Sequence, residues 1–220
     1  MISIALDGPA GAGKSTIAKA ISEKLGIVYL DTGAMYRTVA LKAFRENIDS
    51  LDHENLSEMI KNINMEVRIM NKQQYMFLDD KDVSEEIRTP AISIGASNVA
   101  LVPEVRIKMT NIQREFASKN DVVMEGRDIG SYVLPNATLK VFLTASLEKR
   151  AERRHKQLIA NGNSQVSIAD VKKDIEYRDM NDSNRNFAPL VKAKDAIEID
   201  TTYLTIEQVI EKISSNIGKC

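Results

Sequence analysis

Short apolar runs alternate along the chain with longer stretches in which apolar residues recur every three or four positions. The runs of strand length lie at residues 2–6, 27–30, 122–124, 139–143 and 196–199. Helical patterns occupy intervening and following stretches, at residues 14–25, 34–45, 105–116 and 206–217. Strands separated by helices need crossover connections. The pattern therefore predicts an α/β fold, with a parallel sheet of about five strands flanked by helices on both faces.

Residues 62–90 have a different pattern. Met65, Val67 and Ile69 alternate with polar residues, and a polar turn leads to a second alternating run that holds Tyr75 and Phe77. Alternation with a period of two is typical of a strand with one buried face. We expect a small β-rich insertion here, and an exposed decorating loop is the alternative.

Composition excludes several classes of protein. The 220 residues carry 30 Lys+Arg against 31 Asp+Glu, which argues against a protein that coats nucleic acid through a cationic surplus. No apolar stretch approaches the roughly 20 residues that a membrane-spanning helix needs. The lone Cys220 offers no internal disulfide. We expect a single-domain cytoplasmic protein with no nucleic-acid or membrane partner, and a monomer.

One motif indicates the chemistry. The segment after the first predicted strand matches the P-loop pattern G-x-x-x-x-G-K-[ST]. The residues predicted to bind a nucleoside triphosphate, which the resemblance given below implies is ATP, are Gly8, Pro9, Ala10, Gly11, Ala12, Gly13, Lys14, Ser15 and Thr16. Glycines let backbone N–H groups surround a phosphate at a helix N-terminus. Lys14 is expected to reach the β- and γ-phosphates, and the Ser15 hydroxyl is expected to bind Mg²⁺.

Three kinds of reaction use such a loop. A GTPase needs a D-x-x-G switch and an N-K-x-D guanine motif, and the chain has neither. A translocating ATPase is usually larger and carries an apolar strand that ends in an acidic pair, which only Met124-Glu125 and Leu6-Asp7 resemble. Phosphoryl transfer to a small acceptor remains. An anionic acceptor would need arginines to hold two polyanions together.

Arginines stand at positions that suit this requirement. Arg37 and Arg127 each follow a predicted strand, at the edge where α/β sheets bind ligands. Arg150, Arg153 and Arg154 share one face of a predicted helix, which is either a solvated charged helix or a lid that closes over phosphates. Arg178, Asp182 and Arg185 have helical spacing as well, and an exposed ion pair is the alternative there.

Several blocks together resemble the bacterial cytidylate kinases, within the nucleoside-monophosphate kinase group. They are Leu6–Thr16, Leu30–Arg37, Glu125–Gly130, Arg178–Arg185 and Ala188–Leu190, and they follow the order of that family over nearly the whole chain. Ser131-Tyr132 stand where the family commonly has Thr-Val. The resemblance implies a core at 1–36, 98–148 and 166–220, a monophosphate-binding segment at 37–97 and a lid at 149–165. The β-rich insertion at about 62–90 would extend the monophosphate-binding segment.

The resemblance also implies roles for individual residues. The CMP-binding set would be Thr32, Tyr36, Arg37, Ser97, Arg106, Arg127, Asp128, Arg178, Asp182 and Arg185. Within it, three arginines would hold the acceptor phosphate, namely Arg37, Arg127 and Arg185. Arg178 and Asp182 would hold the ribose, and Ser97, Arg106 and Asp128 would read the base. The catalytic residues would be Lys14, Arg127 and Arg153, and Arg154 would bind ATP.

The expected activity is ATP-dependent phosphorylation of CMP, and also of dCMP, by direct in-line transfer with Mg²⁺. A carboxylate at Asp128 suits the amino group of cytosine and disfavours the carbonyl oxygen that uracil has there. Two alternatives stay open from the residues alone. One is a P-loop kinase for another monophosphate or a non-nucleotide acid, and the other is a nucleotide-dependent binding module without phosphoryl transfer.

Overall fold

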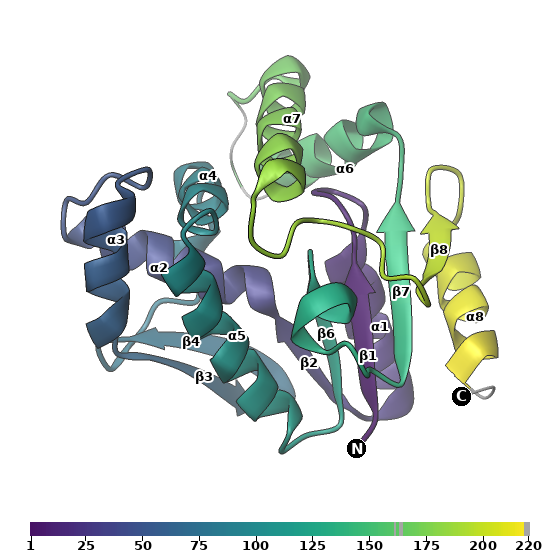
Figure 1. Ribbon diagram of the computed structural model, residues 1–220. Coiled ribbons are helices and arrows are strands. Elements are labelled where there is room, and N and C mark those ends of the chain that lie inside the picture. The colour runs from purple at the N-terminus through teal and green to yellow at the C-terminus, as the bar shows by residue number, and fades with distance from the viewer. Residues whose placement is uncertain (161, 163–164, 218–220) are drawn as a thin grey trace.

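A parallel sheet forms the centre of the molecule. The computed structural model describes residues 1–160, 162 and 165–217, so Cys220 lies outside the described residues. The five strands run in the order β2 (Val28–Asp31), β6 (Val122–Gly126), β1 (Ser3–Asp7), β7 (Leu139–Thr144) and β8 (Ile197–Asp200). All neighbouring pairs are parallel (Figure 1). This confirms the predicted α/β fold, because each of the five apolar runs overlaps a strand of the sheet.

Helices cover both faces of this sheet. On one face, α1 (Lys14–Leu25) and α8 (Ile206–Ile217) pack against Ile4 and Leu6 of β1. On the other face, α5 (Pro103–Ala117) and a π-helical turn, η3 (Ile129–Val133), cover Ala5 of the same strand. Successive side chains of a strand point to opposite faces. A strand buried on both faces must be apolar throughout, which explains the continuous runs in the sequence.

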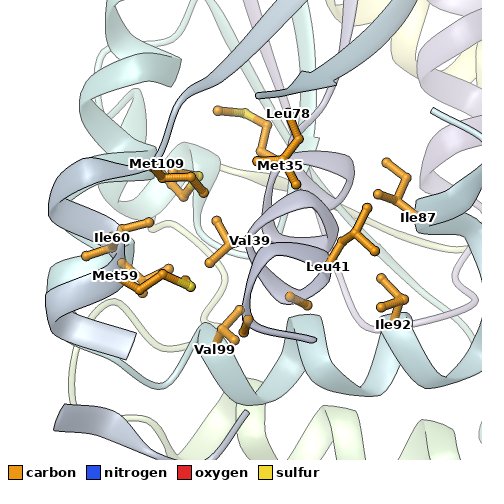
Figure 2. Packing of buried hydrophobic residues seen from close by; sticks show 14 of the residues in the cluster. Met35, Val39, Leu41, Met59, Ile60, Leu78, Ile87, Ile92, Val99 and Met109 are labelled. Carbon is orange, nitrogen blue, oxygen red and sulfur yellow. The ribbon is translucent and has the colours of Figure 1, made fainter. Parts of the chain in front are cut away.

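A second core lies beside the sheet. It is built by α2 (Thr32–Arg45), α3 (His53–Met59), η1 (Ile60–Asn62), η2 (Glu86–Arg88), α4 (Pro90–Val99) and part of α5. Figure 2 shows Met35 and Val39 of α2 among side chains that include Met109 and Leu78, all of them fully buried. This core gives the segment between β2 and β6 its own hydrophobic packing.

The insertion is an antiparallel hairpin that packs into the second core. It consists of β3 (Met65–Met70) and β4 (Gln73–Leu78), with a two-residue strand β5 (Lys81–Asp82). The hairpin confirms the β-rich insertion, and burial of Leu78 excludes a merely decorating loop. The apolar face of β4 is Met76 and Leu78, however, whereas Tyr75 and Phe77 lie on the opposite face. There Phe77 packs under the guanidinium of Arg68, 4.0 Å from the ring centre.

Two helices cross above the carboxyl edge of the sheet, α6 (Leu147–Ala160) and α7 (Ile168–Asn184) (Figure 1). Their buried side chains Ala151, Leu158 and Ile175 form a small cluster with Ala10 of the P-loop. These helices are therefore packed directly onto the predicted phosphate-binding loop. No helix in the described ranges is both long and apolar enough to cross a membrane.

Candidate active site

The P-loop lies between β1 and α1 in a conformation that only glycine allows at its first position. Gly8 has φ +147°, and a Cβ there would lie 2.0 Å from the carbonyl oxygen of Leu143 in β7. Gly13, with φ +94°, stands at the N-cap of α1 and supplies no side-chain cap. The first N–H groups of α1 therefore lack a capping side chain, which is the arrangement that binds phosphate.

Lys14 is buried within this loop. Its Nζ donates a hydrogen bond to the carbonyl oxygen of Pro9 at 2.8 Å, and only 6 % of the residue is exposed. Burial, followed by repulsion from Arg127, lowers the pKa of Lys14 to about 7, although Glu125 and Asp182 act in the opposite direction. An anion that enters the loop would stabilise the charged form of this buried lysine.

Next to Lys14, Ser15 lies close to the side chains of Tyr29 and Glu125, and all three line one cleft. Burial raises the pKa of Glu125, and the nearby charge of Asp31 adds to that effect. The carboxylate of Glu125 also accepts a short hydrogen bond from the hydroxyl of Tyr29. In the described part of the chain, no group of three or more His, Cys, Asp or Glu side chains is arranged to hold a metal ion by itself.

The carboxylates of Asp7 and Asp31 have other partners. Asp7 accepts from the backbone N–H groups of Ile129 and Gly130, at 2.8 and 2.7 Å. Asp31 pairs with Arg37 at 2.8 Å. Of the carboxylates of Asp7, Asp31 and Glu125, Glu125 is therefore the one that the structure brings to Ser15.

The predicted CMP-binding residues converge on one pocket at the carboxyl edge of the sheet. They come from α2, α4, α5, the loop between β6 and η3, and α7 with its C-cap residue. Every one of them lines this pocket: Thr32, Tyr36, Arg37, Ser97, Arg106, Arg127, Asp128, Arg178, Asp182 and Arg185. A larger cleft of about 990 Å³ adjoins it and holds the P-loop. Arg37, Arg127 and Arg178 line both spaces, so the two lie side by side.

Asp128 and Asp182 bind the arginines of this pocket to one another. Asp128 forms a short ion pair with the fully buried Arg106 and a longer one, 3.4 Å, with Arg185. Asp182 contacts Arg127 at 2.7 Å and Arg185 at 3.4 Å. Burial alone would raise the pKa of Asp182, but Arg127 and Arg185 outweigh it and hold the pKa below its ordinary value. Asp182 is buried, so the alternative of an exposed helix ion pair is wrong.

Some guanidinium N–H donors of the pocket have no partner among the residues that the structure describes, although carboxylates bind other nitrogens of the same arginines. Within the described residues, the Nε atoms of Arg37 and Arg106 are buried and have no hydrogen-bond partner. Burial, and then repulsion from Arg127, lowers the pKa of Arg178 to about 10. Unpaired buried donors are costly. The pocket is therefore suited to an anionic ligand that carries several acceptor oxygens.

The three arginines of α6 differ in their surroundings. Arg150 is buried and donates to the carbonyl oxygens of Ala145 and Ala10, both at 3.0 Å. It does not share an open face with the other two, and its role in the structure is to hold the P-loop. Arg153 donates to the carbonyl and hydroxyl oxygens of Thr201, and Arg154 lines the same cleft as the P-loop. Residues 161, 163 and 164 of the predicted lid lie outside the described residues.

The sequence reasoning missed three further residues that belong to this site. Asp179 of α7 accepts from the backbone N–H of Ala10 and pairs with Arg150. Thr201 donates to the carbonyl oxygen of Ala12. Gln74 of the hairpin bonds the backbone of Asp31. Polar residues directly after the last strand could have pointed to Thr201, but no periodic pattern marks the other two.

The sequence matches the family model described as "Cytidylate kinase" over residues 4–219. The chain belongs to the cytidylate kinase family. Relatives named cytidylate kinase include one from Alkaliphilus oremlandii that is 52 % identical over 96 % of this chain and 95 % of its own. Another, from Caldicellulosiruptor saccharolyticus, is 48 % identical over 96 % of this chain and 93 % of its own. The chain is an enzyme of this family, which confirms the resemblance found in the sequence.

Solved structures with low sequence identity agree on the fold. A gluconokinase from Sinorhizobium meliloti has a TM-score of 0.52 and is 14 % identical, and the match covers 99 % of this chain and 92 % of that one. A shikimate kinase from Bacteroides thetaiotaomicron has a TM-score of 0.50 and 13 % identity, with 99 % and 98 % covered. Both of these proteins are named kinases, and at this identity they support the P-loop kinase fold alone.

Proposed function

We propose that this kinase transfers the γ-phosphoryl group of ATP to CMP, and also to dCMP, giving ADP and CDP or dCDP. The observation that carries the proposal is that the P-loop cleft and the arginine-lined pocket lie side by side and share three lining arginines, Arg37, Arg127 and Arg178. This arrangement would let a triphosphate on the P-loop meet a monophosphate held by arginines. Arg127 lines both spaces and lies close enough to lower the pKa of Lys14, which supports it as a bridge between the two.

The chemistry needs no general base, because the acceptor phosphate oxygen is already ionised. That oxygen would attack the γ-phosphorus in line as the bond to the β–γ bridging oxygen breaks, and ADP would leave with the bonding electrons. We propose that Arg37, Arg127 and Arg185 hold the acceptor phosphate. Lys14 and Arg153 would act as catalytic cations that stabilise charge on the transferring group. Arg154, with the P-loop residues, would bind ATP.

The rest of the pocket would hold the nucleoside. Arg178 and Asp182 are proposed to bind the ribose, together with Thr32 and Tyr36 on the α2 side of the pocket. Ser97, Arg106 and Asp128 are proposed to read the base. Asp128 would accept from the cytosine amino group, and uracil would place a carbonyl oxygen against the same carboxylate. A buried mismatch of this kind rejects the wrong substrate.

The residues around Ser15 fit a magnesium ion. The hydroxyl of Ser15 lies near the carboxylate of Glu125, and oxygen donors of this kind are the ligands that Mg²⁺ prefers. When bound, Mg²⁺ would neutralise charge on the ATP phosphates. We therefore propose Ser15 as its direct ligand, with Glu125 acting through water.

Several broader features are part of the same proposal. The enzyme would serve pyrimidine nucleotide metabolism in the cytoplasm as a monomer. Its core would comprise 1–36, 98–148 and 166–220. The segment 37–97 would bind the monophosphate, and 149–165 would act as the lid. The second hydrophobic core between β2 and β6 supports treating 37–97 as a unit.

A product assay tests the function. The purified protein is incubated with ATP, Mg²⁺ and one acceptor at a time, from CMP, dCMP, UMP, AMP, GMP and shikimate, and the products are resolved by chromatography. We expect CDP and dCDP with equal amounts of ADP. Faster turnover of another acceptor would identify a different P-loop kinase, and binding of ATP and CMP without CDP would identify a binding module. Lys14→Ala should remove most turnover.

A further inference from the structure

The inserted hairpin is attached to the central sheet through the side chain of Gln74. Its Oε1 accepts from the backbone N–H of Asp31 at 2.7 Å, and its Nε2 donates to the carbonyl oxygen of Asp31 at 3.1 Å. A backbone N–H can only donate and a carbonyl can only accept, so these two bonds determine the orientation of the amide. Nε2 also lies 3.2 Å from the sulfur of Met76 on the same strand.

This contact lies at the edge of the central sheet, where backbone groups of the outermost strand need partners. Asp31 ends β2, which is an edge strand whose only neighbour among the described strands is β6. An edge strand has backbone groups without a partner. The amide of Gln74 pairs with both backbone groups of Asp31, as one residue of an additional strand would. It thereby joins β4, 43 residues further along the chain, to the edge of the catalytic core.

Asp31 in turn orients an arginine of the acceptor pocket. Its Oδ1 accepts from the backbone N–H of Ala34 and so caps α2, at 3.0 Å. Its Oδ2 accepts from Nη2 of Arg37 at 2.8 Å. Arg37 lines the pocket, and its buried Nε has no partner within the described residues. A chain of hydrogen bonds thus runs from Gln74 through Asp31 to Arg37.

We propose that Gln74 is a positioning residue for Arg37, so that the inserted hairpin sets the affinity for the acceptor phosphate. This inference rests on the proposed function. Without the amide, the N–H and carbonyl of Asp31 lose their partners at the sheet edge, and the hairpin loses its contact there. The carboxylate that holds Arg37 would then no longer be anchored, and a guanidinium placed less accurately binds phosphate less well.

The test measures KM and kcat for Gln74→Met, which keeps the length of the side chain and removes both hydrogen bonds. We expect KM for CMP to rise by about fivefold to tenfold, with KM for ATP and kcat within about twofold of the wild type. Tyr75→Phe is the matched control, because it removes a polar group from the opposite face of the same strand, and it should leave all three values unchanged. Gln74→Glu serves as a second variant if Gln74→Met folds poorly, and thermal melting checks both.

A double-mutant cycle with Arg37→Met separates positioning from general support of the fold. If Gln74 acts through Arg37, then Gln74→Met should change KM for CMP by less than about twofold in the Arg37→Met background. Effects that multiply, or an unchanged KM in a well-folded Gln74→Met protein, would overturn the inference. Failure of the proposed function is distinct, because it would show as absence of CDP with the wild-type protein.

Discussion

Lys14 should become protonated when ATP binds. In the free protein, burial and the charge of Arg127 lower the pKa of this lysine to about 7. A triphosphate in the P-loop would place several negative charges around Nζ and raise the pKa towards its ordinary value. A base whose pKa is lowered carries its charge below that pKa and loses it above. Proton uptake by Lys14 should therefore accompany binding at pH 8 and nearly vanish at pH 6.

The size of the effect follows from this pKa. At pH 8, one unit above it, only about a tenth of Lys14 is charged in the free protein, so binding should take up about 0.9 proton. At pH 6 about nine tenths is already charged, so Lys14 itself should take up only about 0.1 proton. Protonating Lys14 at pH 8 costs about 1.4 kcal/mol. This cost alone should make ATP bind roughly tenfold more weakly at pH 8 than at pH 6.

Calorimetry in buffers of different ionisation enthalpy measures this number of protons. At pH 8 the terminal phosphate of ATP is already ionised, since its pKa lies near 6, and contributes little. Lys14→Arg keeps a cation that stays charged at pH 8, so this variant should bind ATP with almost no uptake. Lys24→Met removes an exposed lysine from the same helix and should behave as the wild type. An uptake near zero for the wild type at pH 8 would refute the reasoning.

Two further substitutions test the pocket and the loop. Asp128→Asn should lower the ratio of kcat/KM for CMP to that for UMP by about tenfold or more, because an amide can donate to the uracil oxygen; an unchanged ratio would remove Asp128 from base recognition. Gly8→Ala would place a Cβ 2.0 Å from the carbonyl oxygen of Leu143, so we expect a clearly lower melting temperature and weak ATP binding. Gly26→Ala meets no atom within 4 Å and should cost much less, and equal losses would contradict the steric argument.

Features that depend on a few neighbouring residues are the easiest to predict from the sequence. The five strands and the helix after the P-loop depend on apolar periodicity over a few residues, and each was found close to its observed position. The P-loop itself is local, because its glycines and Lys14 lie within seven residues of one another. The convergence of the predicted pocket residues came mainly from the family resemblance. Spacing alone placed Arg37 and Arg127 at strand ends and could not pair them with Asp31 and Asp182.

The sequence by itself determined the α/β architecture, the phosphate-binding loop and the family to which the chain belongs. Tertiary structure decided which side chains share a partner. It turned Arg150 inward to hold the P-loop, brought Glu125 rather than Asp7 to Ser15, and placed Gln74 on the edge of β2. The physical reason is that periodicity encodes which face of an element is buried, whereas these contacts join residues far apart in the chain that only the tertiary fold brings together.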